Sequence, residues 1–107
     1  MDKLIKLSDV LLNVEGFEWN DALFVVRDEN LVLDSKCAVL DPDDVEDDAD
    51  EEPRFAIDNN LKYALNMQEI RGVLKNAYEQ KSSCTKNDLL EAFLYYYDND
   101  AFMLFSE

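Results

Sequence analysis

The sequence predicts an α+β fold, in which about three helices pack on one face of a small mixed or antiparallel sheet. Apolar residues recur at helical spacing in three segments, and short runs rich in β-branched and aromatic residues lie between them. Only two glycines and two prolines interrupt the 107 residues, and 48% of the chain is hydrophobic. The length and this apolar content fit a single domain over residues 1–107.

The first helix is expected from about Lys3 or Ser8 to Glu15. Ser8 is placed to cap its start, and Gly16 is placed to end it in the left-handed conformation. The helix has one apolar face, formed by Leu7, Val10, Leu11 and Val14.

Strands are expected at 23–26, at the apolar runs 31–33 and 38–40, and at 61–65. The runs 31–33 and 38–40 could form one interrupted strand or two short ones, paired antiparallel with 23–26. The chain is predicted to end in a further strand, 101–105.

Two more helices are marked by their start signals. Asn66 with Glu69 predicts a capped helix that runs to about Gln80, and Thr85 with Asp88 predicts another. Their apolar faces recur at helical spacing along Met67, Ile70, Val73, Leu74, Ala77 and Tyr78, and along Leu89, Leu90, Phe93, Leu94 and Tyr97.

Residues 41–52 differ from the rest of the chain, because nine of the twelve are acidic and none is basic. Such a segment repels itself and buries little, so a mobile surface loop is expected. A calcium loop of the EF-hand type is disfavoured, since Pro42 spoils the turn and Glu46 stands where glycine is needed. The loop could also serve only to keep the protein soluble.

The residue inventory argues against an enzyme. The chain has no histidine, which removes the commonest general base and metal ligand. Cys37 and Cys84 are far apart and are interpreted as structural thiols, and Gly16 and Gly72 are too isolated for a phosphate-binding loop. We therefore expect no cofactor and no metal. The absence of a signal-peptide pattern and of a long apolar run predicts a cytoplasmic location.

The formal charge of −15 indicates the kind of partner. Nucleic acid and membrane surfaces are excluded by repulsion, whereas a basic protein is attracted, and the free chain is expected to be a monomer. Binding anchors are often aromatic, and Trp19 and the tyrosine run 95–97 lie beside acidic residues, although they could equally cover the margin of the core. The predicted partner-binding residues are Glu18, Trp19, Asp21, Asp43, Asp44, Glu46, Asp47, Asp48, Asp50, Glu51, Glu52, Tyr96, Asp98 and Asp100.

The stretches around Trp19, 37–44, 76–80 and 100–102 look like those of a small family of bacterial proteins. In size and acidity the whole chain resembles the immunity proteins of contact-dependent growth inhibition and related polymorphic toxin systems. The resemblance implies an antitoxin that neutralises a cognate basic toxin domain, commonly a nuclease, in the cytoplasm of the producing cell. It brings no catalytic residues.

Two other functions fit the charge. A nucleic-acid mimic would inhibit a DNA-binding protein, but it would space its acids along a surface rather than crowd them into one loop. A regulatory or scaffold module would use the acidic segment to bind cations or a basic protein.

Overall fold

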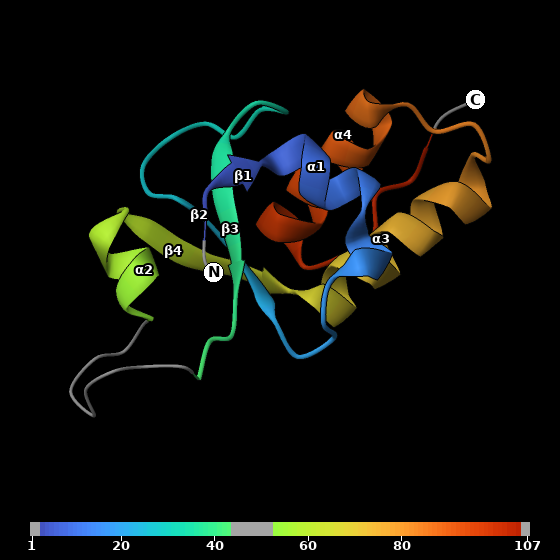
Figure 1. Ribbon diagram of the computed structural model, residues 1–107. Coiled ribbons are helices and arrows are strands. Elements are labelled where there is room, and N and C mark those ends of the chain that lie inside the picture. The colour runs from blue at the N-terminus through green and yellow to red at the C-terminus, as the bar shows by residue number, and fades with distance from the viewer. Residues whose placement is uncertain (1–2, 44–52, 106–107) are drawn as a thin grey trace.

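A computed structural model describes residues 3–43 and 53–105 (Figure 1). Its sheet has four strands in the order β1-β3-β2-β4, and every neighbouring pair is antiparallel. The strands are β1 (Ile5–Lys6), β2 (Ala22–Val26), β3 (Lys36–Leu40) and β4 (Leu61–Asn66). The predicted α+β class is confirmed, and the sheet is the antiparallel one of the two alternatives.

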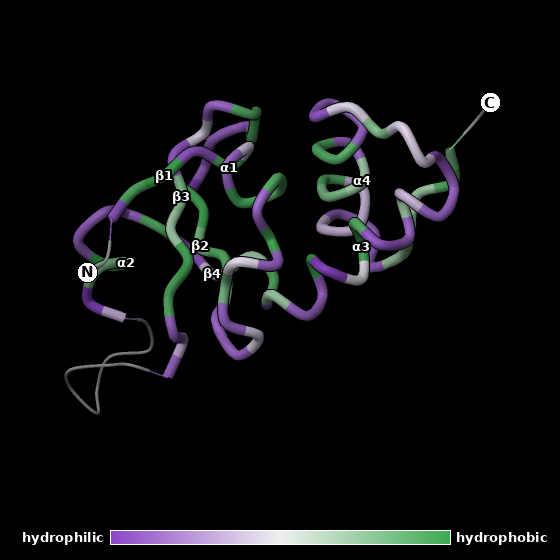
Figure 2. The backbone as a smooth tube through the Cα atoms, turned by 45° about the vertical axis from the view of Figure 1, so that its right-hand side comes forward, coloured by the Kyte–Doolittle hydropathy of each residue, from purple (hydrophilic) through white to green (hydrophobic). Residues whose placement is uncertain are grey.

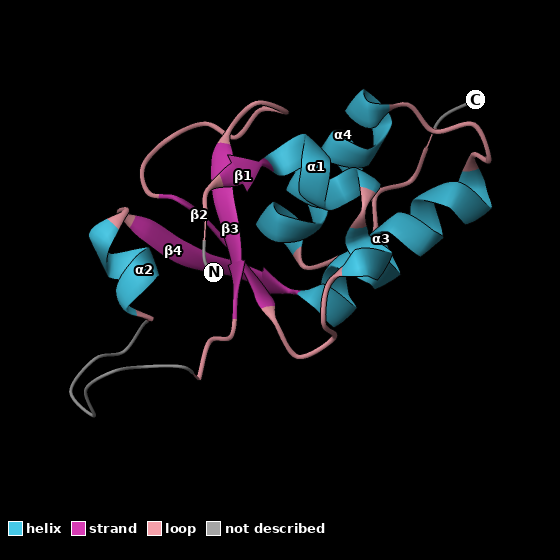
Figure 3. Cartoon of the chain, in the orientation of Figure 1, coloured by secondary structure: helices cyan, strands magenta, loops and turns pink. Residues whose placement is uncertain are grey.

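The helices cover both faces of the sheet unequally (Figures 1 and 3). Three of them pack on one face, as predicted, together with a short 3-10 helix, and the fourth lies against the other face. They are α1 (Leu7–Leu12), the 3-10 helix η1 (Val14–Gly16), α2 (Arg54–Asp58), α3 (Met67–Gln80) and α4 (Lys86–Asn99).

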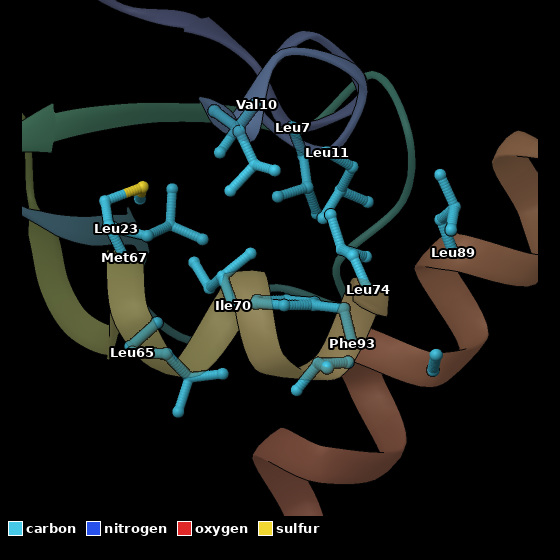
Figure 4. Close-up of a cluster of buried hydrophobic side chains, with 14 of the residues drawn as sticks. Leu7, Val10, Leu11, Leu23, Leu65, Met67, Ile70, Leu74, Leu89 and Phe93 are labelled. Atoms are coloured by element: carbon cyan, nitrogen blue, oxygen red, sulfur yellow. The ribbon is translucent and has the colours of Figure 1, made fainter. Parts of the chain in front are cut away.

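Alternation along β2 divides the core into two layers. Leu23 and Val25 point into the main cluster with α1, α3 and α4, whereas Ala22 and Phe24 point into the smaller cluster under α2. Figure 4 shows the main cluster, in which side chains from α1, α3 and α4 converge beside Leu23 of β2 and Leu65 of β4. Figure 2 shows β2 and β3 as mainly hydrophobic, because both faces of these strands are covered.

The two predicted capping boxes are confirmed. The Asn66 side chain accepts from the Glu69 N–H at 2.7 Å, and Glu69 accepts from the Asn66 N–H at 3.3 Å. Thr85 and Asp88 exchange the same pair of bonds at the start of α4. Both helices therefore begin where their sequences indicate.

The start of the first helix differs from the prediction. Ser8 does not cap it; α1 begins at Leu7, directly after β1. The free N–H groups of Leu7 and Ser8 donate instead to the carbonyls of Ser35 and Leu33, at 2.9 and 3.0 Å. These bonds also explain why the apolar run 31–33 is not a strand, because the Leu33 carbonyl is bonded to the helix start.

Two predictions about chain ends and turns were wrong. Gly16 has no positive φ; it lies in η1, and the chain leaves through extended backbone at Phe17. Residues 101–105 are not a strand. The Gln80 side chain donates to the Met103 carbonyl at 2.8 Å and accepts from the Phe105 N–H at 3.0 Å, so a side chain binds the backbone groups that a strand neighbour would use.

The sequence did not predict α2. This helix follows Pro53, has only five residues and has no side-chain cap. It ends before Asn60, whose positive φ of 57° turns the chain into β4. Ala56 is fully buried against the second face of the sheet, which is why so short a helix forms there.

Candidate functional site

Three segments that are distant in sequence meet at one end of the sheet. Ala22, the first residue of β2, lies opposite Leu40, the last residue of β3, and opposite Asn66, the last residue of β4. The residues just before β2 therefore lie beside those just after β3 and beside the start of α3. We call Glu18, Trp19, Asp21, Asp41 and Asp43 the acidic sheet end.

Trp19 is the most prominent member of the acidic sheet end. It is 60% exposed, so it is not a core residue, whereas the nearby Phe17 packs against the main cluster. Glu18 is exposed and Asp21 is half-buried. The Asp21 carbonyl accepts from the Met67 N–H at 3.0 Å, which fixes this loop to the first turn of α3.

The acidic residues after β3 are only partly described. Asp41 and Asp43 are exposed, and the Asp43 N–H donates to the Asp41 carboxylate at 3.0 Å. The other predicted partner-binding residues of the loop lie outside the described residues; they are Asp44, Glu46, Asp47, Asp48, Asp50, Glu51 and Glu52.

The tyrosine run is divided between core and solvent. Tyr95 is 42% exposed, whereas Tyr96 and Tyr97 are half-buried against the main cluster. The Tyr97 ring stacks on Phe93, and the Tyr96 ring lies 5.6 Å from that of Phe102. Tyr95, which was not among the predicted contacts, thus offers more surface to a partner than Tyr96.

Tyr96 nevertheless lies close to carboxylates. Partial burial, together with the nearby Glu69 and Asp100, raises the pKa of its hydroxyl. Asp98 and Asp100 are exposed at the end of α4, where Asp100 adopts the left-handed conformation with a φ of 52°. Because Tyr96 lies near Glu69, it borders the first turn of α3, where Met67 holds the loop of Trp19.

A groove that the sequence analysis missed lies beside the acidic sheet end. It has a volume of about 820 Å³ and runs between the exposed side of α3 and the end of α1 with η1. Leu12 and Tyr78, which are 48% and 44% exposed, form apolar parts of its walls. Its charged lining residues are Glu15, Arg71, Lys75 and Glu79.

Arg71 joins this groove to the loop of Trp19. Its guanidinium donates to the carbonyls of Val14 and Phe17, so it ties η1 to α3. The Arg71 Nε lies 4.0 Å from the Glu15 carboxylate, and it makes no hydrogen bond to the part of the chain that the structure describes. The Glu15 side chain remains 85% exposed.

Both glycines of the chain line the groove. Neither has a positive φ, and a Cβ added at Gly16 or Gly72 would meet nothing within 4 Å. Gly72 lies in the middle of α3, where glycine is unfavourable relative to alanine by about 1 kcal/mol. A glycine in a helix interior, away from any turn, was therefore the sequence signal that could have indicated this surface.

Catalysis by a metal ion or by a reactive thiol would require suitably placed groups among the described residues. Within 3–43 and 53–105, no group of three or more histidine, cysteine, aspartate or glutamate residues is arranged to hold a metal ion. Burial, with a smaller contribution from Asp9, raises the pKa of the Cys37 thiol to about 12, so this thiol is not a nucleophile at neutral pH. No helix within the same ranges is long and apolar enough to cross a membrane.

Residues 4–105 match a protein family described as "Domain of unknown function (DUF7716)", and the chain belongs to this family. No curated protein and no solved structure matches the chain.

Proposed function

We propose that this member of the DUF7716 family is an immunity protein, an antitoxin that binds and neutralises a cognate basic toxin domain, of the kind found in contact-dependent growth inhibition. The toxin is a nuclease in this proposal, and the chain acts in the cytoplasm by protein–protein interaction, without catalysis of its own. A nuclease must bind phosphate groups, so its cleft is basic and complements a chain of charge −15.

The observation that carries the proposal is the exposure of Trp19. A tryptophan that is 60% exposed leaves a large apolar surface in water, and tryptophan is among the commonest binding anchors. Its neighbours on the acidic sheet end are Glu18, Asp41 and Asp43, all exposed. A basic partner would therefore meet an aromatic anchor surrounded by carboxylates.

The acidic segment 41–52 supplies a second contribution, which acts at longer range. Nine acidic residues in twelve account for most of the net charge, because −6 remains when their −9 is subtracted from −15. Opposite fields accelerate encounter more than they strengthen the final complex. In this proposal the segment speeds capture of the toxin, and the anchor determines how long the complex lasts.

The test is protection of a growing cell. The toxin domain encoded directly upstream of this gene is expressed in a bacterial host with and without the chain. We expect growth arrest by the toxin alone, rescue by the chain, and a complex of the two that survives moderate salt. The absence of a basic partner from the genomic neighbourhood and from pull-downs of the source bacterium would overturn the proposal.

Two sets of variants separate encounter from anchoring in that complex. Changing the acids of 41–52 to Asn and Gln should slow association by about tenfold at low salt and flatten its salt dependence. Trp19→Ala should mainly speed dissociation, with a loss of about 2 kcal/mol in binding free energy.

Val32→Ala is the matched control. Val32 is 54% exposed, and it lies in the connection from the end of β2 to the start of β3, at the opposite end of the sheet. This substitution should change binding by less than about 0.5 kcal/mol. Equal effects at Trp19 and Val32 would show that the acidic sheet end is not the contact surface. Displacement of bound DNA from unrelated DNA-binding proteins would instead favour the nucleic-acid mimic.

A further inference from the structure

We propose that the groove between α3 and η1 receives the apolar side of a basic amphipathic helix of a protein partner. The proposal deepens the immunity function by assigning a second contact surface and the chemistry of the segment that fills it. It rests on the groove, its two glycines and its charges, and not on the acidic segment.

The shape and lining of the groove fit apolar side chains. Leu12 and Tyr78 supply its exposed apolar surface, and the buried residues Leu11, Val14 and Leu74 lie beneath. At about 820 Å³ it has room for more than one large side chain. Apolar groups at successive turns of a helix would lie along such a groove on one face.

The backbone of the lining residues selects a helix over an extended peptide. All of the groove residues lie on α1, η1, α3 or the short link at Asn13, so no strand edge is offered to the occupant. An extended segment buried there would leave its own N–H and C=O groups without partners. A helix satisfies these groups internally and needs only side-chain contacts.

The glycines indicate that the groove is kept open. Gly72 weakens α3, yet neither its φ nor any close neighbour requires the absence of a side chain. Gly16 stands on the opposite wall with the same open space. A side chain at either position would project into the volume that the occupant needs.

The charges select a basic helix. The Glu15 carboxylate is 85% exposed and Glu79 is exposed as well, so both are accessible at the edges of the groove. The Arg71 guanidinium donates to the carbonyls of Val14 and Phe17, and its side chain is only 28% exposed, so it is less accessible to an occupant than the two carboxylates. Lys75 is the exposed cation of the lining, and the chain outside residues 41–52 still carries a net charge of −6, because −9 of the −15 belongs to that segment.

The experiment uses two synthetic helical peptides as probes. Each is about 18 residues long, because shorter helices are marginal in water. One carries leucines at i, i+3, i+4 and i+7 with lysines on its flanks; the other has alanine in place of every leucine and the same charge. Binding to the ¹⁵N-labelled chain is measured by calorimetry and by shifts of backbone amide signals.

We expect the leucine peptide to bind about tenfold more tightly than the alanine peptide, with shifts centred on Gly16, Gly72 and Tyr78. Gly72→Leu fills the groove and should abolish this preference. Tyr78→Ala removes an apolar side chain from the wall of the groove and should reduce the preference for the leucine peptide. This second variant keeps the test decisive if Gly72→Leu folds poorly. Asn87→Leu, which adds an exposed leucine on α4 without a change in charge, should leave the preference intact.

Equal binding of the two peptides, or a preference that survives Gly72→Leu, would overturn the proposal and leave only attraction by charge. The peptide titration does not depend on the toxin. A leucine preference without any toxin partner would support the groove as a helix site and refute the immunity function. A toxin complex unaffected by Gly72→Leu would support the immunity function and refute the groove as a contact surface.

Discussion

Replacing Gly72 with alanine should stabilise the protein, and the size of the effect follows from the structure. The residue lies inside α3 with no positive φ, and an added Cβ meets no atom within 4 Å. The methyl group therefore costs nothing in packing, and the gain is the difference in helix propensity and unfolded-chain entropy, about 0.8 kcal/mol. For a chain of 107 residues this corresponds to a rise in Tm of about 4 °C.

Thermal and urea unfolding followed by circular dichroism at 222 nm would measure this change. Gly16→Ala is the companion variant, because Gly16 has equally open space but lies in a 3-10 turn. It should leave stability within about 0.5 kcal/mol of the wild type. A loss of stability in Gly72→Ala would refute the reasoning, since it would mean that the fold itself requires a glycine in α3.

Three further outcomes are expected. The Cys37 thiol, whose pKa burial raises to about 12, should resist a thiol reagent at pH 8 in the folded protein and react fully in denaturant. Phe93→Ala should lower the free energy of unfolding by about 3–5 kcal/mol in urea titration, because this ring is fully buried in the main cluster. The Thr85 N–H and Lys81 lower the pKa of the Asp88 carboxyl from its ordinary 3.8. The ionised carboxylate therefore stabilises the fold above pH 3.8, and its contribution is lost as the pH falls below that value. Asp88→Asn should abolish this part of the acid dependence in unfolding measured against pH.

The predictions that were confirmed concern features that depend only on residues close together in the sequence. The two capping boxes and the apolar faces of α3 and α4 are local patterns, because each cap joins residues three positions apart. Strand β2 was equally clear, since all five of its residues are apolar. Helices α3 and α4 and strand β2 could therefore be predicted without knowledge of their packing.

The errors arise where a distant group decides the local structure. The run 31–33 has strand composition, but the Leu33 carbonyl accepts from the start of α1. Residues 101–105 have strand composition too, but Gln80, more than twenty positions away, binds their backbone. Both cases show a side chain or a helix terminus competing successfully with strand pairing.

The candidate site was predictable in its residue types and not in its geometry. Exposed acids and an aromatic anchor could be named from composition and spacing, yet only the strand order shows that the residues before β2 lie beside those after β3. The groove could not be predicted from the sequence, because it exists only where η1 packs on α3. Gly72 alone gave a local hint, as a residue that weakens a helix without a structural need.

Arg71 connects the two proposed surfaces, so binding at one surface is expected to affect binding at the other. Its guanidinium binds the carbonyl of Phe17, the residue that separates η1 in the groove wall from Glu18 and Trp19 in the acidic sheet end. A partner that anchors on Trp19 would therefore lie next to the groove. A helix in the groove would contact η1, which is followed directly by the segment that carries Trp19. Contacts joined through a single residue need not be additive. A partner that engages both surfaces should therefore lose less affinity in the double variant Trp19→Ala, Gly72→Leu than the two single losses combined, whereas a partner that uses one surface should be insensitive to the other substitution.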